Sequence, residues 1–205
     1  MMKLMGERAE APVAPPFLRD GDVLVSHVAN VLAYLGPKLG LAPADEAERL
    51  FAHGLQLTIT DFVAEVHDTH HPIATDLYYE DQKAEAKARA AAFLRHRVPK
   101  YLGYFERALN DNPAGPAYAV GNALSTVDLS LFQLWAGMSY AFPRAFAGAA
   151  RTFPALAALA AAVGKRPNVA RYLASERRIP FNESGIFRRY PELDPPPAKA
   201  ARRKG

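Results

Sequence analysis

The segment "LSTVDLSLFQLWAGMSYAF", residues 124–142, begins with a helix-start signal and then becomes apolar on every side. Ser125 is a preferred N-cap residue and Asp128 stands three positions later, so each side chain is placed to bond the other's backbone amide in a capping box. Leu124 and Leu129 supply the flanking hydrophobic staple. Because a helix that is apolar all round must be buried, the pattern predicts a central helix within a helical domain.

Two longer amphipathic helices are predicted upstream of this segment. The stretch 44–71 carries apolar residues at intervals of three and four, with acids in its first turn, where the helix dipole favours them. The stretch 80–111 has a second apolar stripe of the same spacing, interrupted by Pro99, which removes a backbone donor and predicts a kink or restart. Downstream, "FPALAALAAAVGK" and "RPNVARYLASE" predict two shorter helices, each with proline near its first turn.

The N-terminal part of the chain has a different pattern. Two short apolar runs, "PPFLR" and "DVLVS", are separated by Asp20-Gly21, which is a strong hairpin signal because glycine supplies the positive φ of a tight turn. From Val28 onward the apolar residues recur at helical spacing as far as Gly36-Pro37. The first forty residues therefore predict a β-hairpin followed by a helix.

Composition excludes several classes of protein. Half of the 205 residues are hydrophobic, enough for a substantial core, and the absence of cysteine excludes disulfides, thiolate catalysis and zinc–thiolate sites. Residues 188–205 hold six basic and two acidic side chains, which account for the whole formal charge of +4, so no nucleic-acid partner is expected. With no apolar run of membrane-spanning length and no secretory signal, we expect no membrane association and a cytoplasmic protein.

The order of these features resembles the glutathione transferase family. Pro16 aligns with the cis-proline of that family, "NVLAYL" (30–35) with a helix motif, and the "G-x-x-x-S-x-V-D" pattern of 121–128 with its folding motif. The resemblance covers residues 15–193 and implies a mainly α fold. A partial thioredoxin-like hairpin and helix (1–40) would be followed by an all-helical C-terminal domain (41–193), and then by a disordered basic tail (194–205).

The resemblance implies a protein that conjugates glutathione, as co-substrate, to hydrophobic electrophiles, or binds such compounds, as a homodimer. The alternative is a non-catalytic member that uses the same helices to bind protein partners. For glutathione, the resemblance implies contacts from the backbone of Pro15 next to Pro16, from His27 as a donor to a carboxylate, and from Asp61 to the ligand amine, with Glu65 as the other candidate. For the hydrophobic substrate, it implies Tyr140 and Phe142.

Two departures from the family pattern bear on catalysis. The alignment lacks the first strand, first helix and second strand, which carry the Tyr, Ser or Cys that stabilises the glutathione thiolate in the family. Val28 stands where the family has a serine beside a Gln or Glu, a position that His27 occupies here. We therefore assign no catalytic residue and expect weak or no conjugation by these 205 residues. We also expect the hairpin to be covered by residues 1–12 and by a dimer partner.

The "HDTHH" stretch ends the predicted helix 44–71. His67 and His71 lie one helical turn apart and, with a third ligand, offer the donors of a metal site. Histidines near a helix C-terminus are also favoured by the helix dipole without any ligand. No HExxH spacing supports catalytic zinc, and no metal is expected from the sequence.

Overall fold

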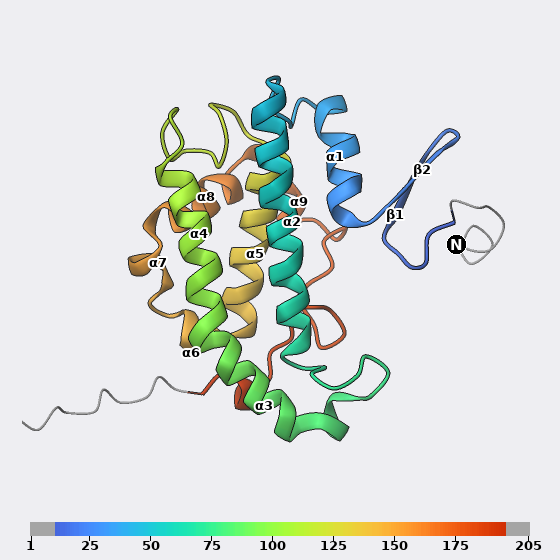
Figure 1. Ribbon diagram of the computed structural model, residues 1–205, viewed down its shortest axis with the longest axis vertical. Coiled ribbons are helices and arrows are strands. Elements are labelled where there is room, and N and C mark those ends of the chain that lie inside the picture. The colour runs from blue at the N-terminus through green and yellow to red at the C-terminus, as the bar shows by residue number, and fades with distance from the viewer. Residues whose placement is uncertain (1–10, 196–205) are drawn as a thin grey trace, which may run out of the picture.

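The computed structural model describes residues 11–195, which form one β-hairpin and a bundle of helices (Figure 1). Strand β1 (Phe17–Asp20) pairs antiparallel with β2 (Val23–Ser26), with Phe17 opposite Ser26 and Asp20 opposite Val23. Gly21 adopts the predicted positive φ, 61°, in the turn. Residues 1–10 of the cover predicted for the hairpin (1–12), and residues 196–205 of the tail predicted over 194–205, lie outside the described range; Asp194, predicted to belong to that tail, is buried.

Helix α1 (Val28–Lys38) follows the hairpin and contacts both strands, while the hairpin projects away from the bundle (Figure 1). The helix continues two residues past Gly36, where the sequence predicted its end, although Pro37 lacks the backbone N–H that would bond the preceding turn. Gly40, with a φ of 66°, lies just beyond the C-cap Leu39. This glycine takes the left-handed conformation that ends many helices.

Helix α2 (Glu46–Asp68) is the longest of the bundle and confirms the predicted helix over 44–71. Its N-cap is Asp45, whose carboxylate accepts the backbone N–H of Glu48 at 2.9 Å. The apolar stripe is buried as predicted at Leu55, Ile59, Phe62 and Val66, whereas Phe51 at its N-terminal end is exposed.

The second predicted helix is divided in the way that Pro99 predicts. A 3₁₀ turn (Tyr79–Gln82) leads into α3 (Lys83–Ala92), a π-helical turn follows at Phe93–Arg97, and α4 (Val98–Asn110) continues the chain. The π-helical turn ends at Arg97, two residues before Pro99, which has no N–H to offer to the preceding turn. The chain therefore restarts its α-helical bonding at α4.

Helix α5 (Thr126–Ala141) is the predicted central helix, and both bonds of its capping box are present. The Asp128 carboxylate accepts the backbone N–H of Ser125 at 2.7 Å, the Ser125 hydroxyl at 2.9 Å and the backbone N–H of Ala119 at 2.7 Å. The side chain is fully buried, and this burial raises the pKa of Asp128 even though the three hydrogen bonds act in the opposite direction.

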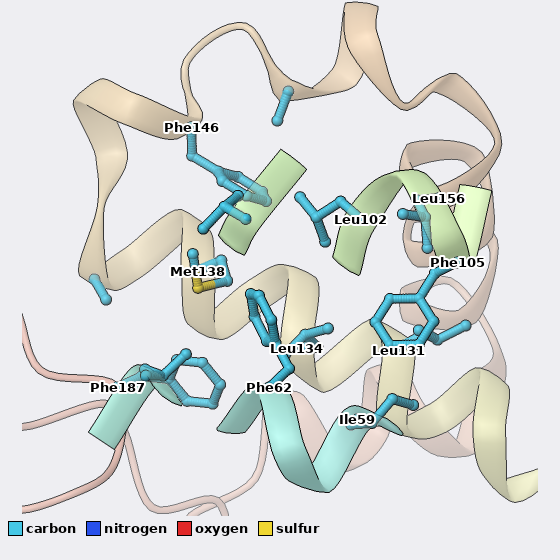
Figure 2. Close-up of a cluster of buried hydrophobic side chains, with 14 of the residues drawn as sticks. Ile59, Phe62, Leu102, Phe105, Leu131, Leu134, Met138, Phe146, Leu156 and Phe187 are labelled. Atoms are coloured by element: carbon cyan, nitrogen blue, oxygen red, sulfur yellow. The ribbon is translucent and has the colours of Figure 1, made fainter. Parts of the chain in front are cut away.

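The core lies where α5 packs on α2 and α8, and α4 also packs on α8 (Figure 1). Figure 2 shows Phe62 of α2 close to Leu134 and Met138 of α5. The remaining helices are α6 (Pro143–Phe146), α7 (Ala149–Thr152), α8 (Pro154–Gly164) and α9 (Pro167–Leu173). Within residues 11–195 no single helix is long and apolar enough to cross a membrane; only Pro143–Thr152 taken together with Pro154–Gly164 would be, as a pair bent by 103°.

The C-terminal segment, residues 176–195, returns along the helices and ends in a 3₁₀ turn at Pro191–Leu193. It is anchored by buried Phe187 and Leu193, and by the Asp194 carboxylate, which accepts the backbone amides of Arg144 and Ala145 at 2.7 and 2.9 Å. Ile179, in the same segment, is 80% exposed and does not anchor it. The described part of the chain thus has a mainly helical fold with an N-terminal hairpin, as predicted.

Candidate functional site

The candidate glutathione-binding residues of the hairpin lie at one end of it. The Pro15–Pro16 peptide bond is cis, as the resemblance implied, and both prolines are exposed. Since Phe17 pairs with Ser26, the antiparallel register places Pro16 and His27 on either side of the open end of the hairpin. His27 is the exposed N-cap of α1 and has a positive φ of 65°. The structure therefore brings these predicted residues together.

The two acidic candidates on α2 are placed very differently. Asp61 is exposed, and within the described residues no ion pair or hydrogen bond is found for its side chain. Glu65 instead receives a bidentate contact from Arg97, with Nε at 2.9 Å and Nη2 at 2.7 Å, and a hydrogen bond from the Tyr101 hydroxyl at 3.0 Å. Glu65 is therefore committed to a structural ion pair, and Asp61 is the available carboxylate.

Two recesses lie beside α1. The first, of about 280 Å³, is formed by α1 and the beginnings of α2 and α5, and its lining includes Ala29, Pro37, Arg49, His53, Gln56 and Ser125. The second, of about 180 Å³, lies at the start of α1 between α2 and α5, and its lining includes Val28, Gln56, Ile59, Thr60, Gln133 and Phe187. We call it the Val28 recess. It is largely apolar and adjoins the His27 end of the hairpin.

Gln56 lines both recesses and was not identified as a site residue from the sequence. As a polar residue it lies outside the predicted apolar stripe of 44–71, but only 4% of the residue is exposed. Its Oε1 has no hydrogen-bond partner within the described part of the chain, although buried side-chain oxygens are usually paired. The available signal was its position next to Leu55 and one turn before Ile59 and Thr60, on the flank of the buried stripe.

The aromatic candidates at the end of α5 do not form one site. Phe142 is only 2% exposed, and its ring lies 6.1 Å from that of Phe93. It is the C-cap of α5 and packs in the core, so its assignment to a substrate site is corrected. Tyr140 is half-buried and stacks on Phe181 of the C-terminal segment, with 4.9 Å between ring centroids.

Three histidines gather at the C-terminal end of α2. His70 is 1% exposed, and its Nε2 lies 2.9 Å from the carbonyl oxygen of Ile186, while its Nδ1 lies 2.6 Å from Nδ1 of His71. His67 stacks on His71, with 4.9 Å between ring centroids. Burial lowers the pKa of His70 to about 4 and also lowers the pKa of His71, and the nearby Arg188 cation contributes in the same direction. Both rings are therefore neutral at pH 7.

The helical bundle with its N-terminal hairpin is a fold that solved structures share. A prostaglandin synthase D of Nilaparvata lugens superposes with a TM-score of 0.64 at 22% identity, covering 81% of this chain and 75% of that one. A glutathione S-transferase of Necator americanus, described as monomeric, superposes with a TM-score of 0.60 at 18% identity over 82% of this chain and 76% of its own.

The sequence comparisons identify the family. The profile described as "Glutathione S-transferase, C-terminal domain" matches residues 67–176, more than half of the chain. The chain therefore belongs to the glutathione S-transferase family. A glutathione S-transferase of Plasmodium falciparum is 25% identical over 79% of this chain and 70% of its own length, and a glutathione S-transferase P of Capra hircus is 26% identical over 83% and 74%.

Proposed function

We propose that this protein is glutathione transferase-like: it binds glutathione and either binds hydrophobic electrophiles or conjugates glutathione to them, with weak or no conjugation expected from these 205 residues. The observation that carries the proposal is the junction between His27 and Val28 at the start of α1. His27 and the exposed backbone at Pro15 offer polar contacts to a peptide-like ligand, and Val28 begins the apolar recess directly behind them. A polar anchoring surface that adjoins an apolar recess suits a reaction between a charged tripeptide and an apolar partner.

Three polar groups of this surface would contact glutathione: the backbone of Pro15, the imidazole of His27 and the carboxylate of Asp61. The backbone of Pro15 pairs with the cysteinyl amide of glutathione, and the His27 imidazole donates to a carboxylate of the ligand. The exposed Asp61 carboxylate accepts the ligand ammonium. The hydrophobic electrophile occupies the Val28 recess. Tyr140, the other aromatic residue that the resemblance implies for this substrate, stacks on Phe181 and is not among the residues that line the recess. No residue is proposed for activation of the thiol.

We also propose that the protein is a cytoplasmic homodimer. Helix α2 exposes large apolar side chains at Leu50, Phe51 and Leu57, which a second subunit would cover. The monomeric Necator americanus neighbour shows that this fold does not require a dimer. Light scattering coupled to size exclusion measures the mass directly, and a mass of 22.4 kDa at all concentrations would contradict the dimer.

Calorimetric titration with glutathione tests the binding proposal. His27→Ala and Asp61→Ala should each weaken binding by about tenfold, since each removes a charged or polar contact. His96→Ala and Asp111→Ala are matched controls, because both residues are exposed on other parts of the surface. The proposal is wrong if millimolar glutathione shows no saturable binding, or if the site variants bind as the controls do.

Val28 favours a second candidate function, which is to bind ligands or protein partners without catalysis. It is 49% exposed, and it places an apolar side chain where the resemblance calls for a hydroxyl. Conjugation of a halodinitrobenzene, followed by absorbance, separates the two functions. Val28→Ser should strengthen glutathione binding if this position contacts the ligand. Saturable glutathione binding without turnover in both proteins would favour the non-catalytic function.

A further inference from the structure

The three histidines at the end of α2 are assembled in a way that neither the proposed glutathione site nor the core requires. Each offers one ring nitrogen, and these nitrogens all lie within 4.8 Å of one another. We propose that His67, His70 and His71 bind one first-row transition-metal ion, such as Zn²⁺, through three imidazole nitrogens. Imidazole is a preferred ligand for zinc, copper and nickel, and three histidines leave a fourth position for water.

The helix backbone fixes the spacing of the three residues. His67 and His71 are four residues apart, so their side chains emerge on the same face of the helix end. The carbonyl oxygen of His67 accepts the backbone N–H of His70 at 3.1 Å and that of His71 at 3.2 Å, which closes the last turn around the cluster. The rings of His67 and His71 are already stacked, with an interplanar angle of 18°.

His70 is oriented as a ligand by a residue far away in the sequence. The Ile186 carbonyl oxygen can only accept a hydrogen bond, so Nε2 of His70 carries the proton, and Nδ1 holds a lone pair. A hydrogen bond from the distal ring nitrogen to a carbonyl is the usual arrangement that fixes the tautomer of a metal-binding histidine. The lone pair of His70 is directed at His71, where the ion would lie.

The ring nitrogens can reach one metal ion with small movements. The Nδ1 of His71 now donates to Nδ1 of His70 over 2.6 Å. A metal ion takes the place of this shared proton, and the His71 ring stays neutral by carrying its proton on Nε2 instead. With bonds of about 2.0 to 2.1 Å, the ligand nitrogens must come within about 4 Å of one another. His67 and His71 are half-buried and can rotate toward the fixed ring of His70.

The charges around the cluster decide what kind of ion it suits. Asp68 lies 3.8 Å from Nδ1 of His67 but is also paired with Arg89 at 3.3 Å, and Arg188 is close enough to act on His70 and His71. These cations do not favour a hard ion that binds by charge alone, such as Ca²⁺. They are compatible with a metal held by neutral nitrogen donors, whose bonds depend on geometry and ligand type. Bound metal would also tie the end of α2 to the C-terminal segment through His70 and Ile186.

Metal titration of the chain without an affinity tag tests this proposal independently of glutathione binding. After treatment with a chelator, the protein should bind one equivalent of Zn²⁺ by calorimetry, and Co²⁺ should produce the intense visible bands of a tetrahedral site. His67→Ala and His71→Ala should each lower the affinity by tenfold or more, by analogy with the loss of groups that support a metal site. His96→Ala, a single exposed histidine on the π-helical turn, is the matched control.

His70→Ala removes a buried side chain and is interpreted only together with its melting temperature. X-ray absorption of the metal-loaded parent protein counts the imidazole ligands without any substitution, and three are expected. The proposal is overturned if neither Zn²⁺ nor Co²⁺ binds at one equivalent, if His67→Ala and His71→Ala bind as tightly as the parent, or if the loaded protein shows fewer than three imidazoles.

Discussion

The Phe187 ring lies against the Cα of Gly137 so closely that a Cβ built on this glycine would come within 2.5 Å of the ring carbons. Gly137 lies within buried α5, where glycine costs about 1 kcal/mol relative to alanine. The absence of a side chain allows the C-terminal segment to approach the central helix. Phe187 also lines the Val28 recess, so this contact sets one wall of the proposed substrate site.

Gly137→Ala should therefore displace Phe187 and destabilise the protein. The new methyl group would force the ring and its segment outward, and overpacking of this kind costs about 1 to 3 kcal/mol, which exceeds the gain in helix propensity. Urea denaturation measures the change, and hydrogen exchange should show faster exchange in residues 185–190.

Gly54→Ala is the matched control for this substitution. Gly54 lies in α2, and a Cβ built there meets no atom within 4 Å. The alanine should stabilise the protein by up to about 1 kcal/mol through helix propensity alone. If Gly137→Ala were as stabilising as Gly54→Ala, the close approach of Phe187 would not matter to the fold.

The capping box gives a second prediction. Ser125→Ala should lower the free energy of unfolding by about 1 kcal/mol, the usual effect of losing an N-cap side chain. Asp128→Ala should cost more, about 2 kcal/mol or above, because it leaves the buried amides of Ala119 and Ser125 without an acceptor. Thermal melts that neither substitution changes would show that this motif does not stabilise the fold.

The ion pair between Glu65 and Arg97 predicts a dependence of stability on pH. Burial acts to raise the pKa of Glu65, but hydrogen bonds from Arg97 and Tyr101, with the charges of Arg97 and Arg89, hold this pKa below its ordinary value. A carboxyl whose pKa is lower in the folded state contributes stability above its unfolded pKa, and that contribution is lost as the pH falls through the folded value. Stability should therefore decrease from about pH 5 downward.

Glu65→Gln isolates this contribution from the other carboxyl groups. The substitution should lower the free energy of unfolding at pH 7, and the difference from the parent should shrink as the solution is acidified toward pH 3. Urea denaturation at a series of pH values measures both curves. A difference that stays constant across this range would mean that the carboxylate charge contributes nothing.

The parts of the fold that the sequence predicted are those set by local interactions. The Asp20-Gly21 turn, the box at Ser125 and Asp128, and the restart at Pro99 each depend on residues within a few positions of one another. The placement of His27 beside Pro16 followed from the family resemblance together with the hairpin register. Such features can be read from the order of residues along the chain.

The parts that the sequence did not predict depend on contacts between distant segments. The family resemblance implied a substrate contact for Phe142, but this residue packs in the core against Phe93. Gln56 lies outside the predicted apolar stripe of its helix, but α1 and α5 cover it. His70 acquires its orientation from Ile186, more than one hundred residues later. The spacing of apolar residues within one helix does not predict which other segment will pack against a given side chain.

The last prediction concerns the hairpin, which within residues 11–195 makes its main contacts between its own strands and with α1. An isolated pair of strands is marginally stable in water, and here only Val25 of the two strands is buried. The amides of Val23–Val25 should exchange with solvent more slowly than those of a free peptide but faster than the amides of α5, because the hairpin can open without disrupting the core. Hydrogen exchange followed by NMR measures all of these rates in one experiment. Exchange at the free-peptide rate would mean that the hairpin is not formed in solution, and the candidate site at Pro16 and His27 would then have no fixed geometry.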